Sequence, residues 1–361
     1  MKVCHISTVH PETDIRIFFK ECLSLKKKYD EVYLIVSSDK DKIINGINIL
    51  SLPCKGGRAY RFFVKKFIAF KRALKVNADV YHFHDPELLF TGLLLKICGK
   101  KVIYDVHEDV PLQILNKSWL GPLWMRKMIS GMFNFMEKGI SSKFDGVVTV
   151  TQEIGEKFYK CKRVCIVRNL PVVKAIKNAE PAKSDNDHTI IIYAGEITEI
   201  RGIKKLIEAV NLLNGRVRLW LLGDWETQEL CDECKKMDGW EYAVYYGRKK
   251  PEDVYGYLKS ADIGMCTLYP KKNYLMSLPI KAFEYIACGL PIIMSDFPYW
   301  RKNFNKYAIF VDPERPDEIA AAIDKIVNSS DKGKQDKKCN FEFSWEEESK
   351  KLTALYDEIL S

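Results

Sequence analysis

Polar side chains follow three short apolar segments in the first half of the chain, at the point where each segment ends. In open parallel sheets, ligands bind beyond the carboxyl ends of the strands, so these groups predict one site at one edge of a sheet. Imidazoles and carboxylates there could orient a polar substrate or move a proton. A lone histidine is more often structural, but convergence of these loops favours function. The candidate residues are His10, Asp14, Arg16, His84, Asp85, His107 and Glu108.

A loop in the second half could hold a phosphate. It follows the apolar segment 189–194 and contains Gly195, Glu196, Arg201 and Gly202. The glycines permit tight turns and a close backbone approach, and the arginine can meet a diphosphate at the next helix start. A surface arginine in an ordinary loop is the alternative.

The segment 277–291 predicts a helix that begins with a free amide end. Ser277 is the expected N-cap, and the helix is expected to end before Pro291. The amide groups and the positive dipole end of a helix N-terminus suit a phosphate. Lys281 adds a charge, and Glu284 could accept hydrogen bonds from a ribose diol. An ordinary capped helix with a solvent-facing glutamate fits the same residues equally well.

The elements that must position these loops alternate between apolar runs, rich in β-branched residues, and longer helical patterns. Runs that are apolar throughout are typical of parallel strands buried on both faces, and the alternation indicates βαβ units. The pattern occurs twice, and the polar segment 172–188 is expected to be a linker. The sequence therefore predicts an α/β protein with two doubly wound, Rossmann-like domains.

The net charge of +9 is concentrated in the first half, where residues 1–172 hold 29 basic and 17 acidic side chains. No acidic residue lies between Asp41 and Asp79. A hydrophobic content of 47% excludes disorder, and the basic half predicts an anionic partner, either a membrane surface or a nucleic acid. We expect residues 58–75 to form a helix with one apolar stripe, Phe63, Phe67, Phe70 and Leu74.

That stripe either packs on the sheet, with the basic side chains solvated, or leaves a basic face that docks on anionic lipid. Residues 119–128 are a second candidate membrane contact, or line an acceptor site. The start of the chain lacks the features of a secretory signal, and no apolar run reaches the length of a spanning helix. The 11 cysteines are odd in number and lie mostly within apolar segments, as Cys4, Cys98, Cys266 and Cys288 do, which favours reduced, core-packed thiols and a cytoplasmic location.

In this order and spacing, the motifs resemble the retaining family-4 glycosyltransferases of the GT-B fold, over almost the whole chain. The matching motifs are residues 10–16, 84–86, 104–108, 201–202 and 278–291. The bacterial members that build cell-surface polysaccharide, such as lipopolysaccharide or capsule, are the most similar. The resemblance implies two facing domains, 1–172 on the acceptor side and 173–340 on the donor side. It also implies a C-terminal helix, 341–361, that packs back on the first domain.

The resemblance implies a hexosyltransferase-type reaction: transfer of a sugar from a UDP- or GDP-sugar to a hydroxyl of a lipid-linked or saccharide acceptor, with retained configuration. It implies no metal, no other cofactor and no nucleic acid. His107, Arg201 and Lys281 would be the catalytic residues, and the residues 10–16, 84–85 and 108 named above would line the acceptor side. The donor-binding residues would be Gly195, Gly223, Arg248, Ser277, Ile280, Ala282, Phe283 and Glu284.

Two positions depart from the family pattern. Met276 stands where the first glutamate of the E-x7-E motif contacts the donor sugar, and Glu196 replaces a basic partner of the diphosphate. Asn273, Tyr274 or Ser277 could substitute in contacting the sugar. The departures keep two alternatives open: a non-catalytic subunit that binds nucleotide sugar or a membrane surface, and a GT-B nucleotide-sugar epimerase.

Overall fold

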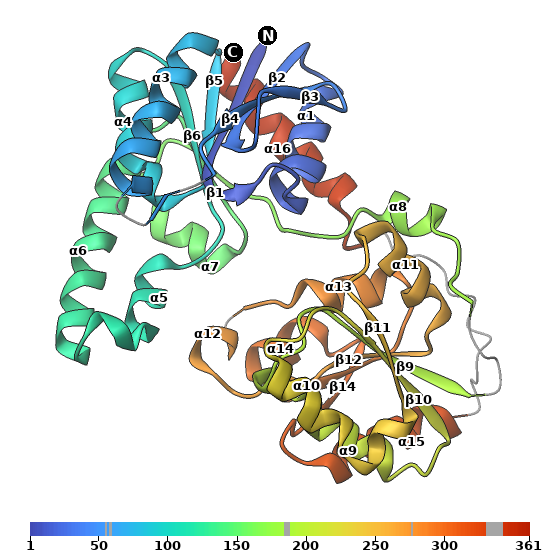
Figure 1. Ribbon diagram of the computed structural model, residues 1–361. Helices are drawn as coiled ribbons and strands as arrows, with labels where there is room; N and C mark the ends of the chain where they lie inside the picture. The colour runs from blue at the N-terminus through green and yellow to red at the C-terminus, as the bar shows by residue number, and fades with distance from the viewer. Residues whose placement is uncertain (55, 58–59, 184–187, 276, 330–341) are drawn as a thin grey trace. The chain divides into compact units, whose positions relative to one another are not determined.

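The computed structural model describes residues 1–54, 56–57, 60–183, 188–275, 277–329 and 342–361 (Figure 1). The chain divides into two compact units. Unit 1 contains Met1–Asn169 together with Trp345–Ser361, and unit 2 contains Leu170–Ser344. Each unit is built on one sheet, so the predicted α/β class with two Rossmann-like domains is confirmed. Among the described residues, no helix is long and apolar enough to cross a membrane.

The sheet of unit 1 has the strand order β3-β4-β2-β1-β5-β6-β7-β8. All neighbouring strands are parallel except β3, which pairs antiparallel with β4 and was too short to be predicted from the sequence. The central strands are buried on both faces, as their uninterrupted apolar character predicts. The strands are β1 (Lys2–Pro11), β2 (Glu31–Ser37), β3 (Lys42–Ile44), β4 (Ile47–Leu52), β5 (Val80–Phe83), β6 (Lys101–Val106), β7 (Gly146–Thr149) and β8 (Val164–Ile166).

Helices α3 and α4 lie on one face of this sheet, and α1 and α16 lie on the other (Figure 1). The C-terminal helix α16 contacts β7, β8 and the helical segment η1, and Trp345 Nε1 donates a hydrogen bond to Ser24 Oγ at 2.9 Å. The helices of unit 1 are η1 (Ile15–Cys22), α1 (Leu23–Lys26), η2 (Arg61–Lys65), α3 (Lys66–Val76), η3 (Pro86–Leu88), α4 (Leu89–Ile97), α5 (Val110–Asn116), η4 (Ser118–Leu120), α6 (Leu123–Ser141), α7 (Gln152–Gly155), η5 (Glu156–Phe158) and α16 (Trp345–Leu360).

The sheet of unit 2 is parallel throughout, in the order β11-β10-β9-β12-β13-β14. The strands are β9 (Thr189–Ala194), β10 (Val217–Leu222), β11 (Ala243–Gly247), β12 (Ile263–Cys266), β13 (Ile292–Ser295) and β14 (Ala308–Val311). One apolar core lies under α9 and α15, and another lies under α8, α11, α13 and α14. The helices are α8 (Val173–Asn178), η6 (Glu199–Arg201), α9 (Ile203–Asn211), α10 (Gln228–Lys235), η7 (Asp238–Tyr242), α11 (Pro251–Ser260), α12 (Lys272–Leu275), α13 (Ile280–Ala287), α14 (Pro298–Phe304) and α15 (Pro316–Asn328).

The predicted apolar stripe of η2 and α3 is wrong in part, because Phe70 packs against the core of unit 1 but the other three members of the stripe are exposed. Phe63 and Phe67 are 79% and 56% exposed, whereas Ala69 and Ala73 are fully buried against the sheet. Small side chains let the helix backbone approach the strands closely, so the alanine stripe forms the contact. Lys65 is also buried rather than solvated, since its ammonium donates to Thr8 O at 2.8 Å. Arg58 lies outside the described residues, as do the side chains of Arg61 and Phe62.

Two further predictions were wrong in part. The expected linker 172–188 begins with α8, whose Val173 and Ile176 are fully buried in a core of unit 2. Because the rest of the segment is polar, the sequence pattern did not predict this short helix. Cys98 is exposed at the end of α4 although it lies in an apolar segment.

Candidate functional site

The carboxylate of Asp85, two residues after β5, holds the carboxyl end of β1. It accepts hydrogen bonds from the backbone amide and hydroxyl of Thr8 and from Ser7 Oγ at 3.1 Å. His10 Nδ1 lies 3.2 Å from the same carboxylate. Burial raises the pKa of Asp85, but the hydrogen bonds from His10 and Thr8 outweigh burial and lower it. The paired carboxylate in turn raises the pKa of His10, against the effect of burial.

Asp105, at the end of β6, joins the other two loops. Arg16 binds its two oxygens through Nη2 at 3.0 Å and Nε at 3.2 Å. His84 Nδ1 and His107 Nε2 lie 3.1 and 2.9 Å from Asp105 Oδ2. Burial alone would raise the pKa of Asp105, but the Arg16 guanidinium holds it well below its usual range. An ionised Asp105 therefore anchors both imidazoles.

His107 is the member of this group that reaches solvent, with its side chain 20% exposed. When its Nε2–H donates to Asp105, its Nδ1 carries a lone pair, and the ring orientation is fixed. His84 is fully buried, and burial lowers its pKa to about 4. His107 can therefore contact a ligand, whereas His84 acts through its neighbours.

The structure brings together five of the seven predicted residues of unit 1: His10, Arg16, His84, Asp85 and His107. Asp14 instead caps η1 by accepting from the amides of Arg16 and Ile17 at 2.8 and 2.9 Å. Glu108 is solvent-exposed. Its role on the acceptor side stays a prediction.

Sequence reasoning missed part of the network. Glu21, His5 and His82 are fully buried beside His84, and Tyr356 of α16 bonds His82 Nδ1 at 2.9 Å. The alternation His82-Phe83-His84 on a strand was a usable signal, because residues two apart share one face. The contribution of Tyr356, 274 residues after His82, carries no local signal.

In unit 2, two cationic side chains meet at the backbone of Gly195. A Cβ at this glycine would lie 3.2 Å from Lys281 Nζ and 3.4 Å from Arg201 Nη1. Gly195 and Gly223 both have positive φ, and a Cβ at Gly223 would lie 1.9 Å from the carbonyl oxygen of Gly195. Glycine is therefore required at Gly223, because any other residue would push the loop after β9 aside.

Lys281 Nζ has no hydrogen-bond acceptor among the described residues, although the atom is buried. It lies 3.7 Å from the centre of the Tyr193 ring, a cation–π contact. Arg201 Nη1 donates to Glu196 O at 3.1 Å, and its Nη2 lies 3.3 Å from Glu196 Oε2. The Glu196 side chain is 60% exposed, so its carboxylate offsets the Arg201 charge from the solvent side only. Two cations beside the backbone of Gly195, with the Glu196 carboxylate contacting only the Arg201 side chain of the two, are an arrangement that attracts an anion.

The predicted N-cap of the following helix is wrong. Helix α13 begins at Ile280 with Pro279 as its N-cap, and Ser277 Oγ donates to Tyr274 O at 3.3 Å instead. Trp300 Nε1 donates to Ser277 O at 2.7 Å and holds this residue outside the helix. The helix nevertheless begins one residue before Lys281, as the anion site requires.

The remaining predicted donor residues differ in exposure. Ala282 and Phe283 are buried in the core, so only their backbone can face a ligand, whereas Ile280 is 41% exposed. Glu284 is half-buried one turn further along α13. Arg248 is 79% exposed and lies 3.2 Å from Asp224. Met276 and the side chain of Asn273 lie outside the described residues.

Two protein families match the chain, one on each unit. Residues 21–169 match "Glycosyltransferase Family 4", and residues 175–340 match "Glycosyl transferases group 1". TuaH of Bacillus subtilis (strain 168), a glycosyltransferase named for teichuronic acid biosynthesis, is 27% identical over 89 residues. The matched segment is 24% of this chain and 22% of TuaH, so the alignment spans about a fifth of that protein.

Solved structures share the fold over the whole chain. Sucrose-phosphate synthase from Thermosynechococcus elongatus has a TM-score of 0.74 at 16% identity, covering 99% of this chain and 98% of that one. Anabaena HepE in complex with UDP has a TM-score of 0.68 at 11% identity, covering 99% and 100%. The UDP-forming trehalose-phosphate synthase from Burkholderia xenovorans has a TM-score of 0.70 at 12% identity, covering 100% and 99%. The two family matches and the fold identify the chain as a glycosyltransferase of the GT-B type.

Proposed function

We propose that this protein transfers a hexosyl group from a UDP- or GDP-sugar to a hydroxyl of a lipid-linked or polysaccharide precursor, with retained anomeric configuration. The bond between the anomeric carbon and the diphosphate oxygen breaks, and a bond to the acceptor oxygen forms. The acceptor proton goes to the departing phosphate oxygen, so no protein nucleophile is needed. The nucleoside diphosphate leaves as the second product.

The observation that carries this proposal is the buried ammonium of Lys281, which lies beside Arg201 and has no acceptor within the part of the chain that the structure describes. Negative charge grows on the diphosphate as it departs, and fixed cations stabilise that charge most when they are shielded from water. Gly195 and Gly223 leave the space in which a diphosphate can approach both cations through the backbone. UDP bound to HepE, a protein of the same fold, supports the nucleotide as the ligand class.

Release of nucleoside diphosphate tests the proposal. Purified protein is incubated with a panel of UDP- and GDP-sugars, with and without lipid-linked acceptors, and released UDP or GDP is measured. We expect release with at least one donor, and a loss of about 10- to 150-fold on Arg201→Ala, since a charged hydrogen bond contributes about 1.5–3 kcal/mol. Nucleotide binding without turnover would instead indicate the non-catalytic subunit. Release of an epimerised sugar nucleotide would indicate the epimerase.

We also propose that the protein acts as a cytoplasmic, peripheral membrane protein through the face formed by η2, α3, α4 and α6. These helices contact one another on one side of the unit 1 sheet. Their outward side chains include large apolar groups that are at least 47% exposed: Phe63, Phe67, Phe90, Leu94, Ile97, Trp124, Met128, Met132 and Phe135. Trp119 and Leu123, at the start of this region, are 65% and 51% exposed. Aromatic side chains of this kind insert at the headgroup boundary.

The charge of the face favours an anionic bilayer. Lys71 and Lys75 are exposed on α3, in the stretch that lacks acidic residues, and each basic side chain near such a surface contributes about 1 kcal/mol. Co-sedimentation with vesicles of phosphatidylglycerol or phosphatidylcholine tests this. We expect binding to the anionic vesicles, lost on Lys71→Glu with Lys75→Glu and kept on Lys235→Glu with Lys236→Glu, the same charge change in unit 2. Equal binding by both variants would contradict the proposal.

A further inference from the structure

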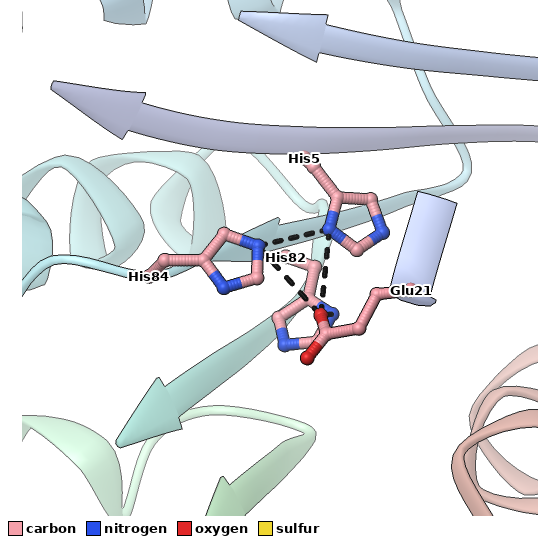
Figure 2. Close-up of side chains that lie close together, drawn as sticks. All are labelled: His5, Glu21, His82 and His84. Carbon is pink, nitrogen blue, oxygen red and sulfur yellow. Dashed lines mark hydrogen bonds and ion pairs between the residues drawn. The ribbon is translucent and has the colours of Figure 1, made fainter. Parts of the chain in front are cut away.

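Three histidines and one glutamate converge inside unit 1, behind the Asp105 network. His5 on β1 lies directly opposite His82 on β5, and His84 follows two residues later on the same face. Glu21, on η1, covers that face, and all four side chains are fully buried. Figure 2 shows His5, His84 and Glu21 pointing toward a common centre, with His82 beside them.

The donor atoms of this cluster are close enough to share one ion. One nitrogen or oxygen from each residue lies within 4.8 Å of all the others. His5 Nδ1 and His84 Nε2 are 2.9 Å apart, and each lies 3.9 Å from Glu21 Oε2. His82 Nδ1 lies 4.0 Å from the same oxygen. Metal–ligand bonds of about 2.0–2.1 Å at tetrahedral angles separate donor atoms by about 3.3–3.4 Å, a value within this observed spread.

Hydrogen bonds satisfy only part of the cluster: His5 Nδ1 bonds His84 Nε2, and His82 Nδ1 bonds the Tyr356 hydroxyl. Both carboxylate oxygens of Glu21 and His82 Nε2 are buried with no hydrogen-bond partner among the described residues. Glu21 Oε1 lies 3.0 Å from Arg16 Nε, but without the geometry of a hydrogen bond. Buried polar groups without partners are costly, so this arrangement points to a missing ligand at its centre.

The outer nitrogens of two of the histidines already have the partners that metal-bound imidazoles use. His84 turns Nε2 toward the centre and its Nδ1 lies 3.1 Å from Asp105 Oδ2. His5 turns Nδ1 toward the centre and its Nε2 lies 3.3 Å from the hydroxyl of Tyr356. The Asp105 carboxylate can only accept, so it fixes the His84 tautomer that leaves the inner nitrogen free to bind a metal. The Tyr356 hydroxyl has the same effect on His5 when its oxygen accepts from His5 Nε2.

We propose that His5, Glu21, His82 and His84 bind one divalent transition-metal ion, with Zn²⁺ as the best fit. Imidazole and carboxylate donors in fourfold coordination suit Zn²⁺, whereas Mg²⁺ and Ca²⁺ prefer oxygen ligands. Four protein ligands without solvent access define a closed, structural site. The ion ties β1, β5 and η1 together beneath the loops of His10 and His107. This site lies outside the proposed transfer chemistry, for which no metal is expected.

A neighbouring group, His84, Asp105 and His107, has similar ligand types. There the Arg16 guanidinium already binds both oxygens of Asp105 at 3.0 and 3.2 Å. Arg16 Nε also lies 3.0 Å from Glu21 Oε1, but the Glu21 oxygens accept no hydrogen bond from the described residues, so we place the ion at the group that contains Glu21. His107 belongs only to the second group, so substitution of His107 should reduce metal binding only if the ion lies there.

Metal content after refolding tests the site. Because the site is enclosed, untagged protein is unfolded with chelator and refolded with ZnCl₂ or CoCl₂, then washed and assayed by elemental analysis. We expect about one ion per chain in the wild type and in His107→Gln. Glu21→Gln and His82→Gln should bind the ion at least about 10-fold more weakly. Refolding of the wild type with Zn²⁺ should also raise its Tm.

Several results would overturn the proposal. A wild type that refolds without retaining metal shows that the cluster is only a hydrogen-bonded core. The ion lies elsewhere if Glu21→Gln and His82→Gln hold as much metal as the wild type. The same conclusion follows if His107→Gln loses its metal. If the buried variants fail to fold, X-ray absorption on the wild type decides, because the site requires nitrogen and oxygen neighbours and a sulfur shell would contradict it.

Discussion

Replacement of Lys281 by Met should have opposite effects on stability and on nucleotide binding. The Lys281 ammonium is buried beside Arg201 and against the Tyr193 ring, and the described parts of the chain offer it no acceptor. In the ligand-free protein this group costs stability. In the complex it would be the group that meets the diphosphate. Met keeps the apolar stem and removes only the charge.

The size of each effect follows from these contacts. A buried polar group without a partner costs about 1–3 kcal/mol, and the cation–π contact offsets about 0.5–2 kcal/mol. Lys281→Met should therefore stabilise the ligand-free protein by about 1 kcal/mol, or about 2–4 °C in the Tm of a unit this size. Loss of a charged hydrogen bond of about 1.5–3 kcal/mol should raise the Kd for nucleoside diphosphate about 10- to 150-fold.

Calorimetry measures both quantities on the same preparation, by scanning without ligand and by titration with UDP and GDP. Lys205→Met is the matched control, because Lys205 belongs to the same unit and pairs with Glu208 at 2.8 Å on the surface of α9. The control should change neither quantity by more than about 0.5 kcal/mol. A Lys281→Met variant that is destabilised without ligand and binds nucleotide normally would refute the assignment of Lys281 to an anion site.

Three further substitutions test the account of the fold and its electrostatics. Gly223→Ala should destabilise unit 2 by at least about 2 kcal/mol, because its Cβ meets the Gly195 carbonyl oxygen at 1.9 Å at a φ of +140°; an unchanged Tm would contradict this. Arg16→Met should cost about 3–5 kcal/mol, because it leaves Asp105 buried without its cation, and a denaturant midpoint equal to that of wild type would be evidence against the pairing. Burial raises the pKa of Glu137 from 4.5 to about 7, so this carboxyl stabilises the fold below pH 4.5 and loses that contribution as the pH rises through 7. The stability of Glu137→Gln relative to wild type should therefore rise by up to about 3 kcal/mol between pH 4 and pH 8. A difference in Tm between variant and wild type that stays the same across that pH range would exclude the shift.

The sequence predicted the strands well because a strand buried on both faces is apolar throughout. The apolar segment 189–194 coincides with β9, and the polar groups of both candidate sites lie at the carboxyl ends of strands or in the segments that follow them. The convergence of His10, Asp85 and His107 followed from the rule that parallel strands end at one edge. The same rule placed Arg201 near the end of β9.

Other features depended on packing that no local pattern encodes. The periodicity of α3 allowed two apolar stripes to face the sheet, one with Ala69 and Ala73 and one with Phe63 and Phe67. The alanines face it because their small side chains let the helix approach the strands closely. Charged residues in a helical pattern predict a solvated face. Arg16 and Glu21 on η1 are instead buried, because Asp105 and the histidines of β1 and β5 lie beneath them.

The central claim is that unit 2 binds a nucleoside diphosphate at Gly195, between Arg201 and Lys281. Isothermal titration of the wild type with UDP and with GDP, repeated on Arg201→Ala, tests it most directly. We expect a single site for one of the two nucleotides and a Kd raised about 10- to 150-fold in Arg201→Ala. No binding of either nucleotide, or equal binding by wild type and variant, would contradict it.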